Sequence, residues 1–267
     1  MSKLSLSISP AILEKFPDAK LACALIKIVV QDSKKIKNPQ ANYLSNLKQQ
    51  VVKHLMDLGI DKTNYETLGV CKSWNKIFDL MQVHDGKKST IINLLKRASN
   101  EIDKLKQEKK ADLGKISNFV DFYNCLSINE LTPMGAFDAS QIEGDIILRF
   151  GQVGETFQGL GKSEIEQVKV SHVVYADDKS ILTWLWNYRD ASHVSVPIDS
   201  EGRSCYILLF ADQAEEYNVK NFLERPGNIK AAMQAVEKEI GNIGGTVLST
   251  YYLDKITPKM TMEVPND

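Results

Sequence analysis

The feature that most restricts the fold of this chain is a change of texture at Asp112-Leu113-Gly114. Before this point, apolar residues recur mostly at helical spacing, as in residues 39–58. After it, strand-like segments follow in close succession with short turns between them: residues 145–150, 156–160, 168–175, 181–188 and 205–210. Because short turns favour antiparallel hairpins, the order predicts a layered α/β (α+β) domain, a mostly antiparallel sheet with flanking helices.

Other segments complete this outline. Residues 3–8 alternate between polar and apolar side chains, which predicts a half-buried strand, and Ser9-Pro10 has the residue types that begin a helix. We expect a buried strand at 21–30, a strand at 247–253, and helices at 39–58, 74–81, 89–105, 116–126 and 229–240. We divide the chain into a helical lead-in with one or two strands, residues 1–115, packed on a sheet-rich domain, residues 116–267.

Cysteine and histidine are few and dispersed, with four of each and no CxxC spacing. We therefore expect no structural zinc, no disulfide framework and no metal or organic cofactor, in a reducing compartment such as the cytoplasm. No apolar run approaches the roughly 18 residues of a membrane span. The first ten residues are typical of a strand and not of a secretory signal. A cytoplasmic location without membrane contact is the resulting expectation.

The charge is close to balanced overall but uneven along the chain. A net charge of −1 argues against a protein that holds nucleic acid mainly by neutralising phosphates. Between Lys87 and Lys115, however, nine basic residues stand against four acidic ones. This basic segment is either a solvated helix face or a patch that steers an RNA backbone.

The strand-rich half carries motifs that are more specific than any fold argument. The run Val120–Gly161 resembles the B3/B4 tRNA-binding domain of the phenylalanyl-tRNA synthetase β subunit. The matching positions are Asp121, Asn124, Ser127, Pro133, Gly135, Ala136, Asp138, Gly144, Asp145, Arg149, Gly154 and Glu155. Residues 173–196 resemble the W-N-x-R segment of freestanding versions of this module. The resemblance covers about two thirds of the chain.

In the synthetase this module hydrolyses wrongly charged aminoacyl-tRNA. The resemblance therefore implies a freestanding deacylase that acts in trans on the aminoacylated 3′ end of tRNA, with no DNA partner. Two other functions stay open: a non-catalytic tRNA- or RNA-binding module, and a sensor of a free amino acid. Gly135 stands where the synthetase pattern has a histidine. Either the chemistry survives without the imidazole, a different amino acid is accepted, or only binding remains.

Nine residues are nominated for the site. Asn124 and Glu155 are the catalytic candidates, which would position water and the ester, and a carboxylate can also act as a base. Substrate binding is assigned to Ser127, Gly135, Asp138, Arg149, Trp186, Asn187 and Arg189.

Several candidates also have a structural interpretation. Asn124 and Ser127 share a helix face and suit the stitching of the following loop. Asp138 suits the capping of a turn, Glu155 a hairpin contact, and Arg149 an internal ion pair as well as a phosphate contact.

Residues 183–189 are predicted to continue a strand. Strict alternation then places the aromatic side chains Trp184, Trp186 and Tyr188 on one face and Asn187 and Arg189 on the other. Such an aromatic row either stacks on the terminal adenosine of tRNA or builds a core.

Overall fold

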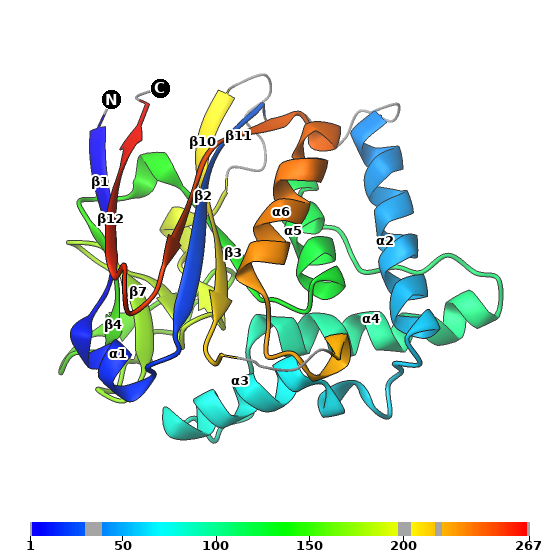
Figure 1. Ribbon diagram of the computed structural model, residues 1–267, viewed down its shortest axis with the longest axis horizontal. Coiled ribbons are helices and arrows are strands. Elements are labelled where there is room, and N and C mark those ends of the chain that lie inside the picture. Colours follow the sequence, from blue (N-terminus) through cyan, green and yellow to red (C-terminus); the bar gives the residue numbers. More distant parts are fainter. Residues whose placement is uncertain (1, 30–38, 197–203, 217–220, 266–267) are drawn as a thin grey trace.

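The computed structural model describes residues 2–29, 39–196, 204–216 and 221–265. Figure 1 shows the sheets on one side of the molecule, with α2, α5 and α6 on the other. The helices are α1 (Pro10–Lys15), α2 (Pro39–Asp57), α3 (Gly69–Leu80), α4 (Thr90–Lys106), α5 (Asn118–Asn129) and α6 (Ile229–Glu239). Helices, a four-stranded sheet and a six-stranded sheet thus form successive layers.

The four-stranded sheet forms the middle layer. Its order is β11 (Gly245–Leu253), β2 (Lys20–Val29), β10 (Ser204–Gln213) and β3 (Met134–Asp138), and every neighbouring pair is antiparallel. Alternate side chains of β10 enter different cores. Ile207 and Leu209 pack with α5 and α6, whereas Leu208 and Phe210 pack with the other sheet. Both faces of the sheet are therefore buried at its central strands β2 and β10, whereas the edge strand β11 is partly exposed.

The six-stranded sheet forms the outer layer. Its order is β12 (Lys259–Val264), β1 (Ser2–Ile8), β4 (Ile146–Phe150), β7 (Val173–Ala176), β8 (Ile181–Trp184) and β9 (Arg189–Asp190). Strands β1 and β4 are parallel, and the other neighbours are antiparallel. A small hairpin of β5 (Thr156–Phe157) and β6 (Glu166–Gln167) lies apart from it.

The predicted fold class is confirmed, with differences in the extent of the strands. The expected strand 168–175 begins only at Val173, the strand 156–160 is two residues long, and the strand 181–188 ends at Trp184. Strand β12 was not predicted. Both sheets contain strands from each side of residue 115, because β1 pairs with β4 and β2 pairs with β10. The division at residue 115 stays a prediction. It does not coincide with a boundary between the two sheets, because each sheet contains strands from both parts.

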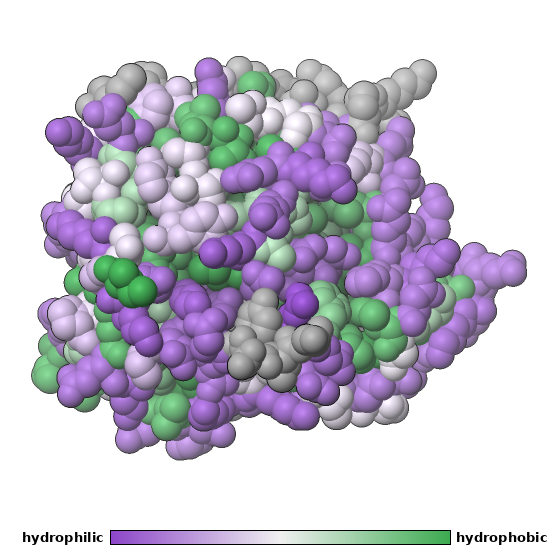
Figure 2. All heavy atoms as spheres, in the orientation of Figure 1, coloured by the Kyte–Doolittle hydropathy of each residue, from purple (hydrophilic) through white to green (hydrophobic). Residues whose placement is uncertain are grey.

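The surface is mostly polar on the face that Figure 2 shows, with hydrophobic areas scattered among hydrophilic ones. Among the described residues, no helix is long and apolar enough to cross a membrane.

Candidate functional site

A pocket of about 320 Å³ lies where α4 and α5 meet the two sheets. One wall is a single face of α4, because Thr90, Asn93 and Arg97 follow at helical spacing. A second wall is the face of α5 that carries Tyr123 and Asn124. The pocket is therefore built from residues far apart in the sequence, held together by the layered core.

The sheets provide the remaining walls. Gly135 of β3, Thr183 of β8, Tyr175 of β7 and Asp212 of β10 all line the cavity. Because neighbouring strand residues point to opposite faces, only some side chains of each strand reach it. The lining is mainly aromatic and aliphatic with a few polar groups, a composition typical of small-molecule sites.

The turn after β8 brings Asn187 to the wall of this cavity. Leu185 and Trp186 both have positive φ, 54° and 66°, an uncommon conformation for residues other than glycine. Val173 accepts a backbone hydrogen bond from Trp186 N at 2.7 Å, and Asn187 O accepts one from Thr90 N at 3.1 Å. The turn is thus held by β7 and by the first residue of α4.

This turn makes the predicted alternation of residues 183–189 wrong. The chain leaves the strand at Trp184, so Trp186 and Asn187 do not occupy opposite faces of a sheet. Trp186 is 0% exposed and packs edge-to-face on Trp74, with ring centroids 5.3 Å apart. Its indole is a core element and not an exposed platform for a base.

Asn187 is the unusual polar group of the pocket. Asn187 is 8% exposed, and neither its amide nitrogen nor its amide oxygen has a hydrogen-bond partner within 3.5 Å among the described residues, although the amide lies close enough to the Asp212 carboxyl group to lower its pKa. A buried amide without partners costs roughly 1–3 kcal/mol for each unsatisfied group. A ligand in the cavity that donates and accepts hydrogen bonds would remove this cost.

Asp212 forms a buried polar network at the cavity wall. Its Oδ1 accepts hydrogen bonds from the Tyr175 hydroxyl at 2.5 Å and from Trp186 Nε1 at 3.2 Å. Burial raises the pKa of Asp212 to about 7, although the polar side chains of Tyr175, Trp186 and Asn187 around it lower it. This carboxyl group is therefore only partly ionised at neutral pH.

A second carboxylate, Asp190, lies at the end of β9. Its Oδ1 accepts a hydrogen bond from Thr183 Oγ1 at 2.6 Å. Burial raises the pKa of Asp190 to about 6, against the lowering effect of that bond. Among the described residues, no lysine or arginine nitrogen lies within 4.0 Å of this carboxylate. In the described part of the chain, this carboxylate therefore has no direct ion-pair partner, although Arg97 and Arg189 line the same pocket.

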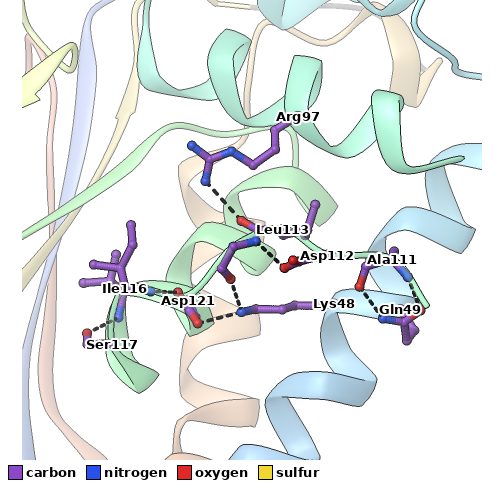
Figure 3. A network of polar contacts seen from close by, with 11 residues as sticks. Lys48, Gln49, Arg97, Ala111, Asp112, Leu113, Ile116, Ser117 and Asp121 are labelled. Atoms are coloured by element: carbon purple, nitrogen blue, oxygen red, sulfur yellow. Dashed lines mark hydrogen bonds and ion pairs between the residues drawn. The ribbon is translucent and has the colours of Figure 1, made fainter. Parts of the chain in front are cut away.

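The connection between α4 and α5 is clamped at one edge of the pocket (Figure 3). Gln49 of α2 makes two hydrogen bonds of 2.8 Å with the backbone of Ala111. Lys48 pairs with Asp121 at 2.6 Å, and Arg97 donates to Leu113 O at 3.1 Å. These contacts fix the connection that brings Ile116 to the pocket.

Five of the nine nominated residues line the pocket: Asn124, Gly135, Trp186, Asn187 and Arg189. The other four, Ser127, Asp138, Arg149 and Glu155, do not line it. Asp138 accepts hydrogen bonds from the backbone and the hydroxyl of Ser140, which makes it a turn cap. Ser127 is fully buried, and its hydroxyl has no partner among the described residues.

Arg149 and Glu155 form a two-pronged ion pair at the base of a turn. Arg149 Nη1 donates to Glu155 Oε2 at 3.0 Å, Arg149 Nη2 donates to Oε1, and Gln152 N donates to Oε2 at 2.7 Å. Burial alone would raise the pKa of Glu155, but these hydrogen bonds outweigh it and hold the pKa below its usual range. An ionised carboxylate held in this way suits a hairpin contact better than a proton acceptor.

We expect Glu155→Gln to cost about 1 kcal/mol of unfolding free energy, since the pair is only partly buried. Ligand binding in the pocket should be unchanged. Denaturant unfolding and calorimetric titration measure the two quantities. A general base would behave differently, because its loss typically lowers a rate by roughly 10²–10⁴-fold.

Several lining residues were missed in the sequence. Asp212 lies two residues beyond the strand that was predicted at 205–210. Its only local signal was its position as an acidic residue directly after an apolar run. Asp190 directly follows the W-N-x-R segment. Thr90 and Asn93 carry no motif, and helical spacing alone did not show that this face of α4 borders a cavity.

Three of the nine basic residues in the segment 87–115, Lys87, Lys88 and Lys104, form ion pairs with acidic side chains among the described residues. Lys88 contacts Glu66 at 3.0 Å, and Lys104 contacts Glu101 at 2.8 Å. Arg97 is exposed beside the pocket. This favours the interpretation of a solvated helix face, with Arg97 as the member that borders the site. Among the described residues, no three His, Cys, Asp or Glu side chains gather as metal ligands would.

The fold and the pocket together define a layered α/β domain with a pocket between its helices and its sheets. The sequence model of the B3/4 domain matches residues 88–221, half of the chain, and the chain belongs to the B3/4 domain family. The phenylalanine–tRNA ligase beta subunit of Chromobacterium violaceum is 29% identical over 106 residues, which is 40% of this chain and 13% of that protein. The chain thus spans only a small part of the length of this curated relative.

A solved structure is also similar in outline. It is the crystal structure of an N-terminal fragment of the phenylalanyl-tRNA synthetase beta subunit from Pyrococcus horikoshii, with a TM-score of 0.43 and 9% identity. The similarity covers 100% of this chain and 55% of that chain.

Proposed function

We propose that this protein hydrolyses the ester bond of mischarged aminoacyl-tRNA in trans, in the cytoplasm, with the aminoacyl group bound in the pocket. The observation that carries the proposal is the buried Asn187 amide in the pocket wall, which has no hydrogen-bond partner within 3.5 Å in the described part of the chain. An aminoacyl ester offers a carbonyl oxygen to this amide, and that oxygen becomes negatively charged when water attacks. Membership of the B3/4 family supports tRNA as the carrier, since the curated relative is a tRNA ligase subunit.

The size of the pocket suits this substrate. A volume of about 320 Å³ is near the lower end for small-molecule sites, which leaves room for an aminoacyl group. The RNA would remain outside. Arg97 is exposed and Arg189 is half-buried at the pocket. Their planar guanidinium groups suit the phosphates of the last nucleotides.

Three side chains of the pocket, Asn124, Asn187 and Asp212, take part in the reaction. Water, positioned by Asn124, attacks the ester carbonyl carbon, and Asn187 Nδ2 donates to the oxygen that gains charge. Asp212 accepts the proton of the water, which a carboxylate with a pKa of about 7 can do at neutral pH. The carbon–oxygen bond to the ribose then breaks, the ribose oxygen takes that proton, and the free amino acid leaves. The ester is already activated, so orientation and charge stabilisation suffice.

A second candidate is binding of a free amino acid without hydrolysis. The observation that favours it is the presence in one pocket of a carboxylate, Asp190, and an arginine, Arg189, groups of opposite charge. Together they complement an ammonium group and a carboxylate. A thermal-shift screen with the twenty amino acids tests it. Raised melting temperatures together with no ester hydrolysis would favour this sensor over the deacylase.

We expect the purified protein, with EDTA and without ATP, to release amino acid from at least one mischarged tRNA in a panel of all twenty charged tRNAs, natural and mischarged. Ester hydrolysis is downhill and needs no nucleotide, and the chain has no P-loop motif. Asp212→Asn should slow the release by roughly 10²-fold or more. Glu155→Gln, outside the pocket, is the matched control and should retain the rate. Spontaneous hydrolysis rates across the whole panel would refute the enzyme.

A further inference from the structure

We propose, on the basis of the proposed function, that Asp190 and the open space over Gly135 form a subsite for the free α-ammonium group of the ligand. The pocket would accordingly accept aminoacyl groups whose amine is unmodified and reject those whose amine is acylated. The inference rests on the position of Asp190, on the absence of a side chain at Gly135, and on the neighbouring Asn187 amide.

Asp190 faces the position where a side chain of residue 135 would lie. A Cβ atom placed on Gly135 would be 3.6 Å from Asp190 Oδ2 and 3.7 Å from Oδ1. Both carboxylate oxygens therefore border the space over this glycine. Gly135 sits in regular strand β3, paired with Phe210, so its backbone does not demand glycine. Because Gly135 has no side chain, it leaves space beside the Asp190 carboxylate.

The residues that the structure describes place no cationic group in direct contact with this carboxylate. Thr183 Oγ1 is the hydrogen-bond donor to Asp190, and it is neutral. Asp212, in the wall of the same cavity, adds negative charge instead of compensating it. A half-buried carboxylate of this kind is stabilised by a cation. An ammonium group that occupies the space over Gly135 provides both the charge and the hydrogen-bond donors.

Asn187 gives independent evidence that a polar ligand belongs in this cavity. The residue is more than nine-tenths buried, and its amide has no hydrogen-bond partner within 3.5 Å among the described residues, with the Asp212 carboxyl group as its polar neighbour. In an aminoacyl group, the α-ammonium and the ester carbonyl are separated by a single carbon. A ligand that reaches Asp190 with its amine and Asn187 with its carbonyl therefore uses both unsatisfied groups of the pocket. An acylated amine has no charge and carries extra atoms into a space the size of one side chain.

The pH dependence follows from the groups that face Asp190. Burial raises the pKa values of Tyr175 and Tyr123, followed by the charge of Asp212 for Tyr175 and that of Asp190 for Tyr123, so both phenols stay neutral. Arg97 and Arg189 are the basic side chains that line the same pocket. Asp190, with a pKa near 6, loses its charge below that pH, and Asp212 loses its own below about 7. An α-amine loses its proton above about 8. The preference for a free amine should therefore be strongest between about pH 6 and 8.

The test uses non-hydrolysable probes: 3′-deoxy-3′-aminoacylamidoadenosines that carry an alanyl, phenylalanyl or lysyl group, each with a free or an acetylated α-amine. Calorimetric titration of the wild-type protein should show about 10- to 100-fold tighter binding of at least one free-amine probe than of its acetylated partner, the usual value of a charge-assisted hydrogen bond. In Asp190→Asn, the amide oxygen can still accept the hydrogen bond from Thr183. This variant should bind the free-amine and acetylated probes equally, both above and below pH 6. Glu155→Gln should change neither.

Several results would overturn the subsite. These are equal binding of each free and acetylated pair, a preference that survives Asp190→Asn, and binding of no probe to the wild-type protein. A further outcome is that the lysyl probe binds equally well with a free and with an acetylated α-amine, while the other pairs show no preference. In that case Asp190 would bind the side-chain ammonium of lysine instead of the α-ammonium. If Asp190→Asn does not fold, Gly135→Ala serves in its place, because its Cβ makes only ordinary contacts and reduces the same space.

The failure of this subsite and the failure of the proposed function are distinguishable. Binding of the probes does not require hydrolysis, so a free-amine preference can be measured in a protein that releases no amino acid. Conversely, hydrolysis of free and N-acetylated aminoacyl-tRNA at equal rates would retain the deacylase and overturn the subsite.

Discussion

Replacing Asn187 with leucine is expected to lower the rate of aminoacyl-tRNA hydrolysis by about 100- to 1000-fold while making the protein more stable. The loss is typical of removing one donor that is oriented toward a developing negative charge. The gain in stability comes from the unsatisfied amide, whose burial costs roughly 1–3 kcal/mol. Leucine has a similar branched shape, so it removes the polar atoms with little change in packing. Residues placed for function commonly show this opposition between stability and activity.

Ser127 provides the matched control for Asn187. Its hydroxyl is also buried and without a partner among the described residues, but it does not line the pocket. Ser127→Ala should therefore be neutral or stabilising and should leave hydrolysis unchanged. Unfolding in urea and single-turnover deacylation measure both variants. If Asn187→Leu destabilises the protein by more than about 1 kcal/mol, the amide has a structural partner and is not reserved for a ligand.

Trp186→Phe is expected to destabilise the protein by about 2 kcal/mol more than Trp74→Phe does. The two indoles are a close pair, since both are 0% exposed and each packs on the edge or face of the other. They differ in one respect. Trp186 Nε1 donates to Asp212, whereas Trp74 Nε1 has no partner among the described residues. Phenylalanine keeps most of the ring burial at either position, so the difference isolates a hydrogen bond to a carboxylate, worth roughly 1.5–3 kcal/mol.

The same substitution should also disturb the pocket. Trp186 precedes Asn187 in a turn with positive φ at two residues, and such a conformation persists only where surrounding contacts hold it. Losing the bond to Asp212 should loosen the turn and weaken binding, and Trp74→Phe should not. Chemical unfolding of the two variants, followed by titration with the probes described above, gives both comparisons. Equal destabilisation would show that the Asp212 bond contributes little to holding the turn.

Local pattern in the sequence was enough to predict the class of fold. Helical spacing in residues 39–58 and alternation in residues 3–8 report which side chains are buried, and burial decides between helix and strand. Short turns between the later strands indicated antiparallel pairing, which the sheets confirm except at β1 and β4. That pair joins strands separated by more than one hundred residues, and no local signal reports such a contact.

Motif resemblance identified the family but did not separate pocket residues from structural ones. Asn124 and Gly135 line the cavity, whereas Arg149 and Glu155 satisfy each other outside it. Both pairs carry family motifs, because a motif retains residues that shape a hairpin as readily as residues that meet a ligand. The difference is whether a polar group already has a partner in the chain, and that depends on the folded structure.

Only the tertiary structure placed the carboxylates and the turn that define the site. Leu185-Trp186 contains no glycine or asparagine, so sequence favoured a continuous strand. Contacts with β7, α4 and Asp212 hold the turn instead. Asp190 acquires its role by facing a glycine more than fifty residues earlier in the chain. Residue types and their spacing thus determined the layers and the family, while the partners of each polar group were decided by long-range packing, because burial and distance between remote segments exist only in the folded chain.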